Sequence, residues 1–363
     1  MPKKPTLVDV SAASGLSVYT VSRALNNAGG VSKASREAVL RTAREMGYVP
    51  NRAAQQLRRN TSASVTVMTA STSNYYYIDM MSGVQQVLRA SGRSAVVADL
   101  ATDGVYSAEA ENAIVQDIIQ ARTAGVVSTL ILSLDNVRLL ESWGIPVVFV
   151  DSSPPKGVRD AASVTTDNYA ASLAVGNHLG EHGYEDWALL MYPSRWSTRA
   201  ERQRGITAAA ANTGARLTVI ECENDPDSAA RALSAHLAAN GSKPPRAVIA
   251  GNNPLLRGAL DVLHGHGIRV PDEVALVAFD EFPWAPFVNP PMTVLNEDSK
   301  HIGEIAATIL TRLIDEQAET AGNGEATPRY RPEDRREVGS NLIIRRSCGC
   351  VPLNLEQSDK GAL

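Results

Sequence analysis

The sequence contains little cysteine, with only Cys222, Cys348 and Cys350 among 363 residues. Secreted domains that depend on disulfides carry a dense and even set of cysteines, so a disulfide-bonded fold is excluded. No apolar run approaches the length of a membrane span, and the first residues lack the apolar segment of a signal peptide. We therefore expect a protein of the cytoplasm.

The common motifs of enzymes are also missing. No nucleophile elbow, phosphate-binding loop or dinucleotide-binding glycine pattern follows a predicted strand, and the loop TASTSNYY after the first strand contains no glycine. Asp151 and Asp167 could form an acid–base pair, but an aspartate before a helix is more often a cap. We favour a cap or a ligand hydrogen bond, and we expect neither catalysis nor a cofactor.

Two groups of metal-ligating residue types occur, and neither predicts a metal site by itself. His178 and His182 lie four residues apart on a predicted helix, which is a spacing compatible with zinc. No third ligand is evident beside them, and the Cys-Gly-Cys at 348–350 lacks the paired spacing of a zinc site. We therefore expect the two histidines on a solvated helix face, with no bound metal.

The charge of the sequence is unevenly distributed. The first sixty residues hold ten Lys and Arg against three Asp and Glu, a net charge of +7, whereas the remaining residues carry −11. A small basic head on a large acidic body is typical of a protein whose head alone binds nucleic acid. The alternative is a merely solvated basic surface, which we would favour only without a recognition helix.

The basic head has the pattern of three short helices. Thr6 can cap the first helix, with Asp9 completing a variant of the capping box. Ser17 can cap the second helix after a break at Gly15, and a third helix begins near Ser32. The short connection between the first two helices is helix-turn-helix spacing.

The second predicted helix, SVYTVSRALN, separates two kinds of residue onto two faces. Apolar residues fall on one side, and the other side carries Tyr19, Ser22, Arg23 and Asn26. A planar cation, hydroxyls and an amide suit the base edges and phosphates of a DNA major groove. The alternative is that Val18 and Tyr19 only cover the core, which is less well supported for Tyr19 because it groups with Arg23.

A short basic segment, NRAAQQLRR at 51–59, follows the head. A helix of fewer than twelve residues is marginal in water, so we expect this one to form only against a partner. Leu57 has no obvious apolar partner within the segment, which favours its burial in a dimer or in DNA. The polar residues 60–64 are predicted to form a linker.

The body, from Val65 onward, alternates short apolar strands with amphipathic helical stretches. That order predicts βαβ units with parallel sheets, and ligand sites at the carboxyl ends of the strands. Eight strands over roughly two hundred residues suggest two sheets with a cleft between them. We therefore predict an N-terminal all-α helix-turn-helix domain with a hinge helix, followed by an α/β domain of two lobes.

The sequence resembles transcription regulators of the LacI/GalR (lactose-repressor) family over residues 5–347. The most specific matches are TLVDVSAASGLSVYTVSRALNN at 6–27 and GYVPNRAAQQL at 47–57, and the body adds RVPDEVALVAFDE at 269–281 and NPPMT at 289–293. The resemblance implies a body like a periplasmic sugar-binding protein, with an effector held between two lobes. It also implies a homodimer that binds pseudo-palindromic operator DNA in the nucleoid.

The resemblance implies specific roles in DNA binding. Val18 and Tyr19 would read operator bases, and Arg23 would reach a guanine. Residues 51–59 match a hinge helix that orders on DNA, in which Leu57, with Ala54 beside it, would wedge into the minor groove. The complete predicted DNA-binding set is Thr6, Ser17, Val18, Tyr19, Thr20, Ser22, Arg23, Asn26, Asn51, Ala54 and Leu57.

The resemblance also implies an effector site. Arg202, Asn252 and Asp280 offer donors and acceptors for sugar hydroxyls at strand ends. The predicted effector-binding set is Ser71, Asn74, Tyr75, Asp151, Trp196, Arg202, Asn252, Asp280 and Trp284. Near the cleft the sequence departs from the family at Asn253, Glu297 and the tyrosines 75–77, which leaves the effector's identity open.

We therefore predict a repressor controlled by a small molecule, most simply a sugar. The alternatives are a non-sugar effector or an activator within the same family, and, from other classes, a sugar-binding enzyme or a solute-binding protein. The predicted divisions are a DNA-binding domain at 1–50, a hinge and linker at 51–64, an effector and dimerisation domain at 65–347 and a tail at 348–363. Within the body we assign 65–160 and 286–320 to the N-lobe, and 161–285 and 326–347 to the C-lobe.

Overall fold

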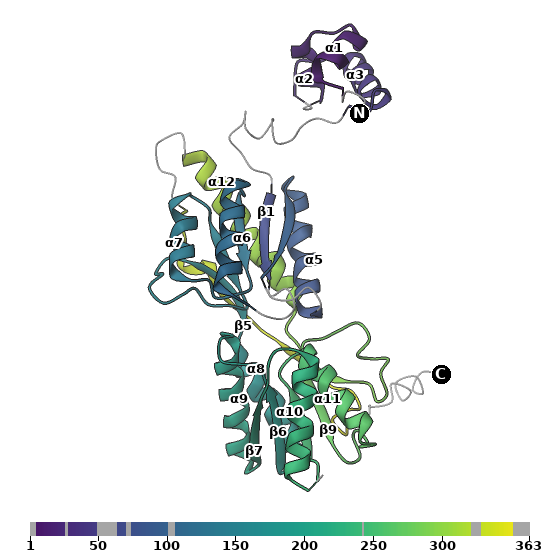
Figure 1. The fold of residues 1–363 in the computed structure, drawn as a ribbon, viewed down its shortest axis with the longest axis vertical. Coiled ribbons are helices and arrows are strands. Elements are labelled where there is room, and N and C mark those ends of the chain that lie inside the picture. The colour runs from purple at the N-terminus through teal and green to yellow at the C-terminus, as the bar shows by residue number, and fades with distance from the viewer. Residues whose placement is uncertain are drawn as a thin grey trace, which may run out of the picture. The chain divides into compact units, whose positions relative to one another are not determined.

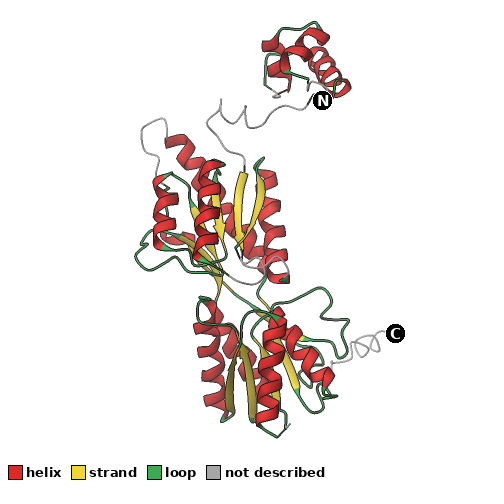
Figure 2. Cartoon of the chain, in the orientation of Figure 1, coloured by secondary structure: helices red, strands yellow, loops and turns green. Residues whose placement is uncertain are grey.

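The computed structural model divides the chain into two compact units, residues 1–62 and 63–363 (Figures 1 and 2). It describes residues 5–25, 28–48, 64–69, 74–100, 106–241, 243–320 and 328–350. The predicted hinge at 51–59 lies outside these residues, as do Asn26 and Ser71. Within the described ranges, no helix is both long and apolar enough to cross a membrane.

The first unit contains three helices: α1 (Leu7–Ser14), α2 (Val18–Leu25) and α3 (Lys33–Glu45). Thr6 forms the predicted capping box with Asp9, and the Ser32 hydroxyl accepts a hydrogen bond from the Ser35 amide at the start of α3. One side chain cluster holds the three helices together, formed by Val10, Val21, Ala24, Val39 and Ala43. The helical prediction for this unit is therefore confirmed.

One lobe of the second unit, the N-lobe, is built on an all-parallel sheet in the order β11-β5-β4-β3-β1-β2. Its strands are β1 (Ser64–Thr69), β2 (Ser94–Asp99), β3 (Gly125–Ser128), β4 (Val147–Val150), β5 (Ala162–Thr166) and β11 (Arg335–Val338). Its helices are α5 (Tyr75–Ala90), α6 (Ala108–Gln120), α7 (Leu134–Ser142) and α12 (Ser299–Thr320), and the short helix η3 (Pro332–Asp334) precedes β11.

Helices cover both faces of the N-lobe sheet at its central strands, whereas the edge strands β2 and β11 are largely exposed. Successive strand residues point to opposite faces, so Val67 packs with α5 and α12 while Met68 packs with α6 and α7. Helices α5 and α12 approach closely at Gly83, where a Cβ atom would stand 2.0 Å from the Lys300 carbonyl oxygen. Glycine is required there because any side chain would separate the two helices.

The other lobe, the C-lobe, is built on a second sheet in the order β12-β10-β9-β8-β6-β7, in which only the β10–β12 pairing is antiparallel. Its strands are β6 (Asp186–Met191), β7 (Arg216–Glu221), β8 (Ala247–Ala250), β9 (Ala275–Phe279), β10 (Thr293–Asn296) and β12 (Asn341–Ile343). Its helices are α8 (Asn168–Glu181), α9 (Thr198–Thr213), α10 (Pro226–Ala239) and α11 (Asn253–Gly265); α8 packs on α9, and α10 on α11.

The chain passes between the two lobes three times: after β5, after β10 and after β11. These crossovers correct the predicted lobe boundaries, because β5 and β11 pair within the N-lobe sheet and β10 pairs within the C-lobe sheet. The sequence of an isolated strand does not specify its partner. The apolar strand pattern does not predict β5 and β11, because ASVTT and RREV contain few apolar residues.

Candidate functional sites

The first candidate site is the exposed face of α2 in the head. Tyr19 is 70% exposed and Val18 is 42% exposed, so neither side chain belongs to the buried core. The Arg23 guanidinium donates to the Tyr19 hydroxyl across 3.1 Å, and its Nε donates to the Gly29 carbonyl across 2.9 Å. These contacts hold a cation and an aromatic hydroxyl side by side on an accessible helix face.

Hydroxyl groups lie at the starts of α1 and α2. The Thr6 hydroxyl bonds the Asp9 carboxylate across 2.7 Å, while the Ser17 hydroxyl accepts from the Thr20 amide and lies 2.9 Å from the Thr20 hydroxyl. Ser22 is half-buried on α2. The positive end of a helix dipole together with hydroxyl donors favours anions, which is the chemistry that phosphate contacts require.

The second candidate site is a polar cleft lined from both lobes. The N-lobe contributes the N-cap of α5 and the first turn after it, together with the residue that follows β4; the C-lobe contributes the carboxyl ends of its strands and the start of α9. The lining residues are Asn74, Tyr76, Tyr77, Asp151, Tyr192, Trp196, Thr198, Arg202, Asn224, Asn252 and Asp280.

Six of these lining residues belong to the predicted effector set, namely Asn74, Asp151, Trp196, Arg202, Asn252 and Asp280. Two further predicted residues, Tyr75 and Trp284, do not line the cleft: their rings lie 6.2 Å apart and both pack on Phe282. The physical reason is that Tyr75 begins helix α5 on the side away from Tyr76 and Tyr77, so it meets the loop after β9.

Arg202 is the centre of the cleft and is 2% exposed. Its Nε donates to Asn168 Oδ1 across 2.7 Å, one terminal nitrogen donates to the Gly251 carbonyl across 2.8 Å, and the other donates to Glu297 Oε1 across 2.6 Å. The guanidinium also lies over the Phe279 ring, 4.6 Å from its centroid. Because Asn168 and Glu297 each belong to a crossover, this side chain joins two of the three connections between the lobes.

Three carboxyl groups surround this single guanidinium. Burial raises the pKa of the Asp280 carboxyl well above its usual value, and the neighbouring Glu297, with which it shares a hydrogen bond, raises it further. Burial raises the pKa of the Asp151 carboxyl to about 7, against the opposing effect of Arg202. Near neutral pH the cluster therefore retains protons that these groups would lose in water.

The cleft holds buried polar atoms that have no hydrogen-bond partner in the described protein. They include the Tyr76 hydroxyl, Asp151 Oδ1 and the Trp196 indole nitrogen. A buried polar atom without a partner costs free energy, so each of these atoms favours a bound polar molecule. Asp151 and Asp280 also have positive φ angles, 49° and 68°, an uncommon conformation at the ends of β4 and β9.

Sequence reasoning missed several members of the cleft. Tyr192, Thr198 and Asn224 lie in or beside loops that carry no motif, whereas Tyr76 and Tyr77 belong to the run of tyrosines 75–77 at which the sequence departs from the family. Glu297 is one of the positions at which the sequence departs from the family, and the structure shows that it pairs with Arg202. A carboxylate at such a position is a signal for an ion pair with an arginine of the cleft.

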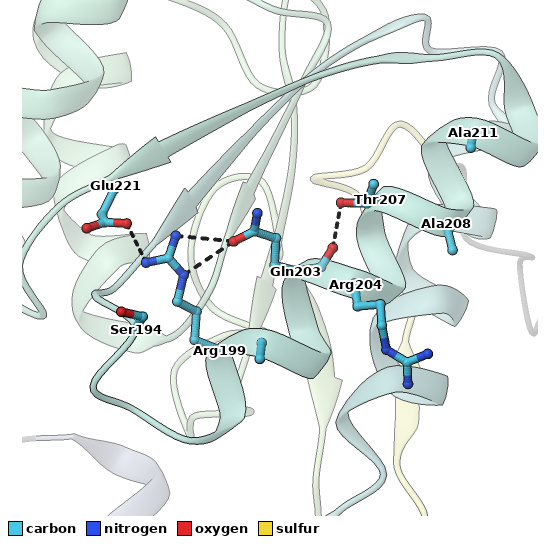
Figure 3. Close-up of a pocket in the computed structure, with 9 residues that line it drawn as sticks. Ser194, Arg199, Gln203, Arg204, Thr207, Ala208, Ala211 and Glu221 are labelled. Carbon is cyan, nitrogen blue, oxygen red and sulfur yellow. Dashed lines mark hydrogen bonds and ion pairs between the residues drawn. The ribbon is translucent and has the colours of Figure 1, made fainter.

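A separate, open groove lies along the outer face of α9 (Figure 3). The polar groups in it are engaged with one another: Arg199 contacts both Glu221 and Gln203, and the Thr207 hydroxyl donates to the Gln203 carbonyl. Its lining comes from the C-lobe alone, so a ligand there would bring no N-lobe group into contact. The cleft around Arg202 is therefore the better candidate for a ligand site.

Comparison with known proteins identifies two domains along the chain. Residues 6–51 match the bacterial regulatory proteins of the lacI family, and residues 177–348 match the periplasmic binding protein-like domain. The transcriptional repressor PurR of Photobacterium profundum is 23% identical over 94% of this chain and 98% of its own.

Solved structures give the same result. The lac repressor dimer, bound to operator and an anti-inducer, superposes with a TM-score of 0.77 at 23% identity, covering 95% of this chain and 99% of that chain. The regulator CelR in complex with cellobiose has a TM-score of 0.65 at 27% identity, covering 94% and 99%. The helical head and the body with its two sheets together define a DNA-binding transcriptional regulator with an effector-binding domain. The chain belongs to the LacI family of these regulators, as its sequence motifs predicted.

Proposed function

We propose that this regulator is a homodimeric repressor whose affinity for operator DNA is changed by a neutral, polyhydroxylated molecule bound in the cleft around Arg202. The supporting observation is the position of Arg202, which lines the cleft while its guanidinium contacts two crossovers. A molecule that competes for those contacts would alter the connections between the lobes. Repression places the protein in the cytoplasm, where chromosomal DNA is available.

The chemistry of the cleft favours a carbohydrate. Sugar hydroxyls both donate and accept, and the cleft offers both kinds of partner through Asn252, Asp151 and Trp196. Among the described lining residues, the cleft's one guanidinium, Arg202, is already paired with the Glu297 carboxylate, so no positive charge is left to balance an anionic effector such as a sugar phosphate. The cellobiose complex of a relative that is 27% identical over most of the chain supports the same class.

In the head, the exposed face of α2 reads the operator, with Tyr19 and Val18 toward base edges and Arg23 toward a guanine. Residues 51–59, with Leu57 and Ala54, act as the hinge helix that orders on DNA. Effector binding selects a lobe arrangement in which two hinge segments of a dimer no longer meet, which is a shift of population. Reciprocity then requires operator DNA to change effector affinity by the same factor.

The test begins with a ligand search on the full-length protein. Neutral sugars, amino sugars, sugar phosphates and purines are screened by thermal shift, because a ligand that binds only the folded state raises the melting temperature. Each hit is then titrated into a complex with DNA selected by the protein from a random pool. We expect a neutral sugar to change DNA affinity, whereas a response restricted to anionic ligands or purines would contradict the proposed effector class.

A matched pair of variants locates the site. Trp196→Phe removes the unpartnered indole N–H from the cleft while keeping an aromatic ring, so it should weaken effector binding severalfold. Trp284→Phe makes the same chemical change outside the cleft and should leave binding unchanged. Equal losses in the two variants would place the effector elsewhere.

A further inference from the structure

Two segments that are remote in sequence bring four metal-ligating side chains together in the C-lobe. His178 lies on α8, His182 caps its C-terminal end, and Cys348 and Cys350 follow β12. One potential ligand atom from each of the four residues lies within 4.8 Å of every other. The cluster combines two imidazoles with two thiols, and none of its four residues lines the effector cleft.

The distances between the potential ligand atoms are already close to those found around one bound zinc ion. His182 Nε2 lies 3.1 Å from the Cys350 sulfur, and His178 Nε2 lies 3.8 Å from the same atom. A tetrahedral zinc ion with Zn–S near 2.3 Å and Zn–N near 2.0 Å keeps its ligand atoms roughly 3.3–3.8 Å apart. The separations within the cluster, all no larger than 4.8 Å, are therefore close to those of four ligand atoms around one ion.

The surroundings also support the cluster. Cys348 is fully buried and His178 is 8% exposed, which corrects the prediction that both histidines lie on a solvated helix face. The Thr293 hydroxyl donates to the Cys348 sulfur across 3.1 Å, a contact that orients a thiolate ligand. On the other side the His182 ring stacks on Tyr184, with a centroid distance of 5.4 Å and an interplanar angle of 10°.

The backbone turns at Gly349, between the two cysteines, so that both sulfur atoms face the two histidines at the end of α8. Gly349 has φ of 93°, and a Cβ at this position would stand 2.4 Å from the Tyr184 hydroxyl oxygen. That hydroxyl donates to the Cys348 carbonyl across 3.0 Å. Glycine is therefore needed between the cysteines, because any other residue would be strained at this φ and would displace the Tyr184 hydroxyl.

We propose that His178, His182, Cys348 and Cys350 bind one zinc ion that fastens the segment after β12 to the end of helix α8. Two thiolates and two imidazoles form a closed, four-coordinate donor set of the structural type, with no position left for a substrate. Helix α8 packs on α9, the helix that carries Arg202. The ion thus stabilises the C-lobe framework on which the effector cleft is built.

The first measurement is the metal content of the full-length protein, purified without chelators, incubated with zinc and freed of excess by gel filtration. We expect close to one zinc per chain by elemental mass spectrometry. Cobalt in place of zinc should give the strong visible absorption of a tetrahedral site with thiolate ligands. Protein that retains no zinc, or that shows a mass lower by two hydrogen atoms through a Cys348–Cys350 disulfide, would overturn the proposal.

Variants then assign the ligands. Cys350→Ser and His182→Ala change half-buried ligands and should lower zinc affinity by more than the roughly 10–100-fold that loss of an outer-shell partner costs. Cys222→Ser removes the third cysteine, which is buried elsewhere in the C-lobe and contacts the Met191 carbonyl, and it should bind zinc as the unchanged protein does. Equal zinc binding in Cys350→Ser and Cys222→Ser would refute the site.

The melting temperature, measured with and without chelator, distinguishes loss of the metal site from poor folding of a variant. Chelator should lower the melting temperature of the unchanged protein and of Cys222→Ser, and added zinc should restore it. The same chelator should leave the melting temperature of Cys350→Ser unchanged, because that variant has no ion to lose. A chelator effect of equal size in Cys350→Ser would show that the ion binds outside this cluster.

Discussion

Arg23 in the head and Arg202 in the body are both held by neighbouring oxygen atoms, but their surroundings are opposite. Arg23 contacts Tyr19, which is 70% exposed, and a loop carbonyl within six residues. Arg202 is 2% exposed, and its partners Asn168 and Glu297 lie 34 and 95 residues away in the chain. Arg23 therefore makes local contacts at the surface of the head, whereas Arg202 links segments that are far apart in the sequence.

This difference has a functional consequence. Arg23 can exchange its protein hydrogen-bond partners for DNA at little cost in free energy. Water can then donate to the oxygen atoms that Arg23 releases. A ligand that takes hydrogen bonds from Arg202 leaves buried oxygen atoms without a donor, so the surrounding segments must move. A half-buried arginine at the surface therefore suits recognition, and a fully buried one suits a switch.

The largest expected effect tests the structural part played by Arg202. Arg202→Ala leaves the Glu297 carboxylate buried without its cation, which should cost about 3–5 kcal/mol in the free energy of unfolding. Urea unfolding of the body measures the loss. Arg204→Ala lies on the same helix but pairs with Glu201 at the surface, so it should change stability little. Equal unfolding midpoints for Arg202→Ala and Arg204→Ala would show that the buried ion pair stabilises the protein no more than the surface pair does.

The next prediction concerns the pH dependence of the cleft. The pKa of Asp151 is raised to about 7 in the folded protein, so between about pH 4 and 7 the folded state holds a proton that the unfolded chain has lost. Stability contributed by this group therefore falls as pH rises through that window, by at most about 1.4 kcal/mol per pH unit. Burial causes the shift, with Arg202 opposing it, Glu297 adding to it and a hydrogen bond with Thr165 lowering it.

Asp151→Asn removes this titration and should flatten the dependence of unfolding free energy on pH. Asp280 titrates in both proteins, so the difference between them isolates Asp151. The control is Asp160→Asn, which changes an exposed carboxyl in the same lobe. Chemical denaturation at a series of pH values measures the slopes, and identical slopes in all three proteins would show that Asp151 has an ordinary pKa.

The two regions also differ in how far their sequence predicts them. The head was predictable because its signals are local: Thr6 with Asp9 and Ser17 before a helix are complete within a few residues. The cleft required long-range information. Its strand-end residues followed from the βαβ pattern and the family resemblance, but Tyr192 and Asn224 carry no local signal.

The histidine and cysteine cluster shows the same limit more clearly. His178 and Cys350 are separated by 172 positions, and neither half has the spacing of a complete site. They meet because β12 pairs antiparallel with β10, which returns the chain to the end of α8. Pairing between strands that are distant in the sequence is a tertiary property, so no sequence window of ordinary length contains it.

A smaller effect is expected at Arg23. Arg23→Ala should relax discrimination at one operator base pair by about 1–3 kcal/mol without unfolding the head, because its hydrogen bonds are exposed. Arg41→Ala removes the same charge from the exposed surface of α3 and should weaken binding to all sequences alike. Affinities for a panel of single-base operator variants measure both. Unchanged discrimination in Arg23→Ala would remove its role in base reading.

The smallest effect should appear at the start of α1. Thr6→Ala removes the hydroxyl that accepts from the Asp9 amide, and loss of such a cap costs about 1 kcal/mol. Thr6→Ser keeps the hydroxyl and should retain most of that stability, as measured by hydrogen exchange of the head amides in the full-length protein. Since Thr6 is also a proposed phosphate contact, Thr6→Ala should weaken DNA binding beyond the loss of helix stability. If DNA affinity falls only in proportion to helix opening, Thr6 acts as a cap alone and the phosphate contact is refuted.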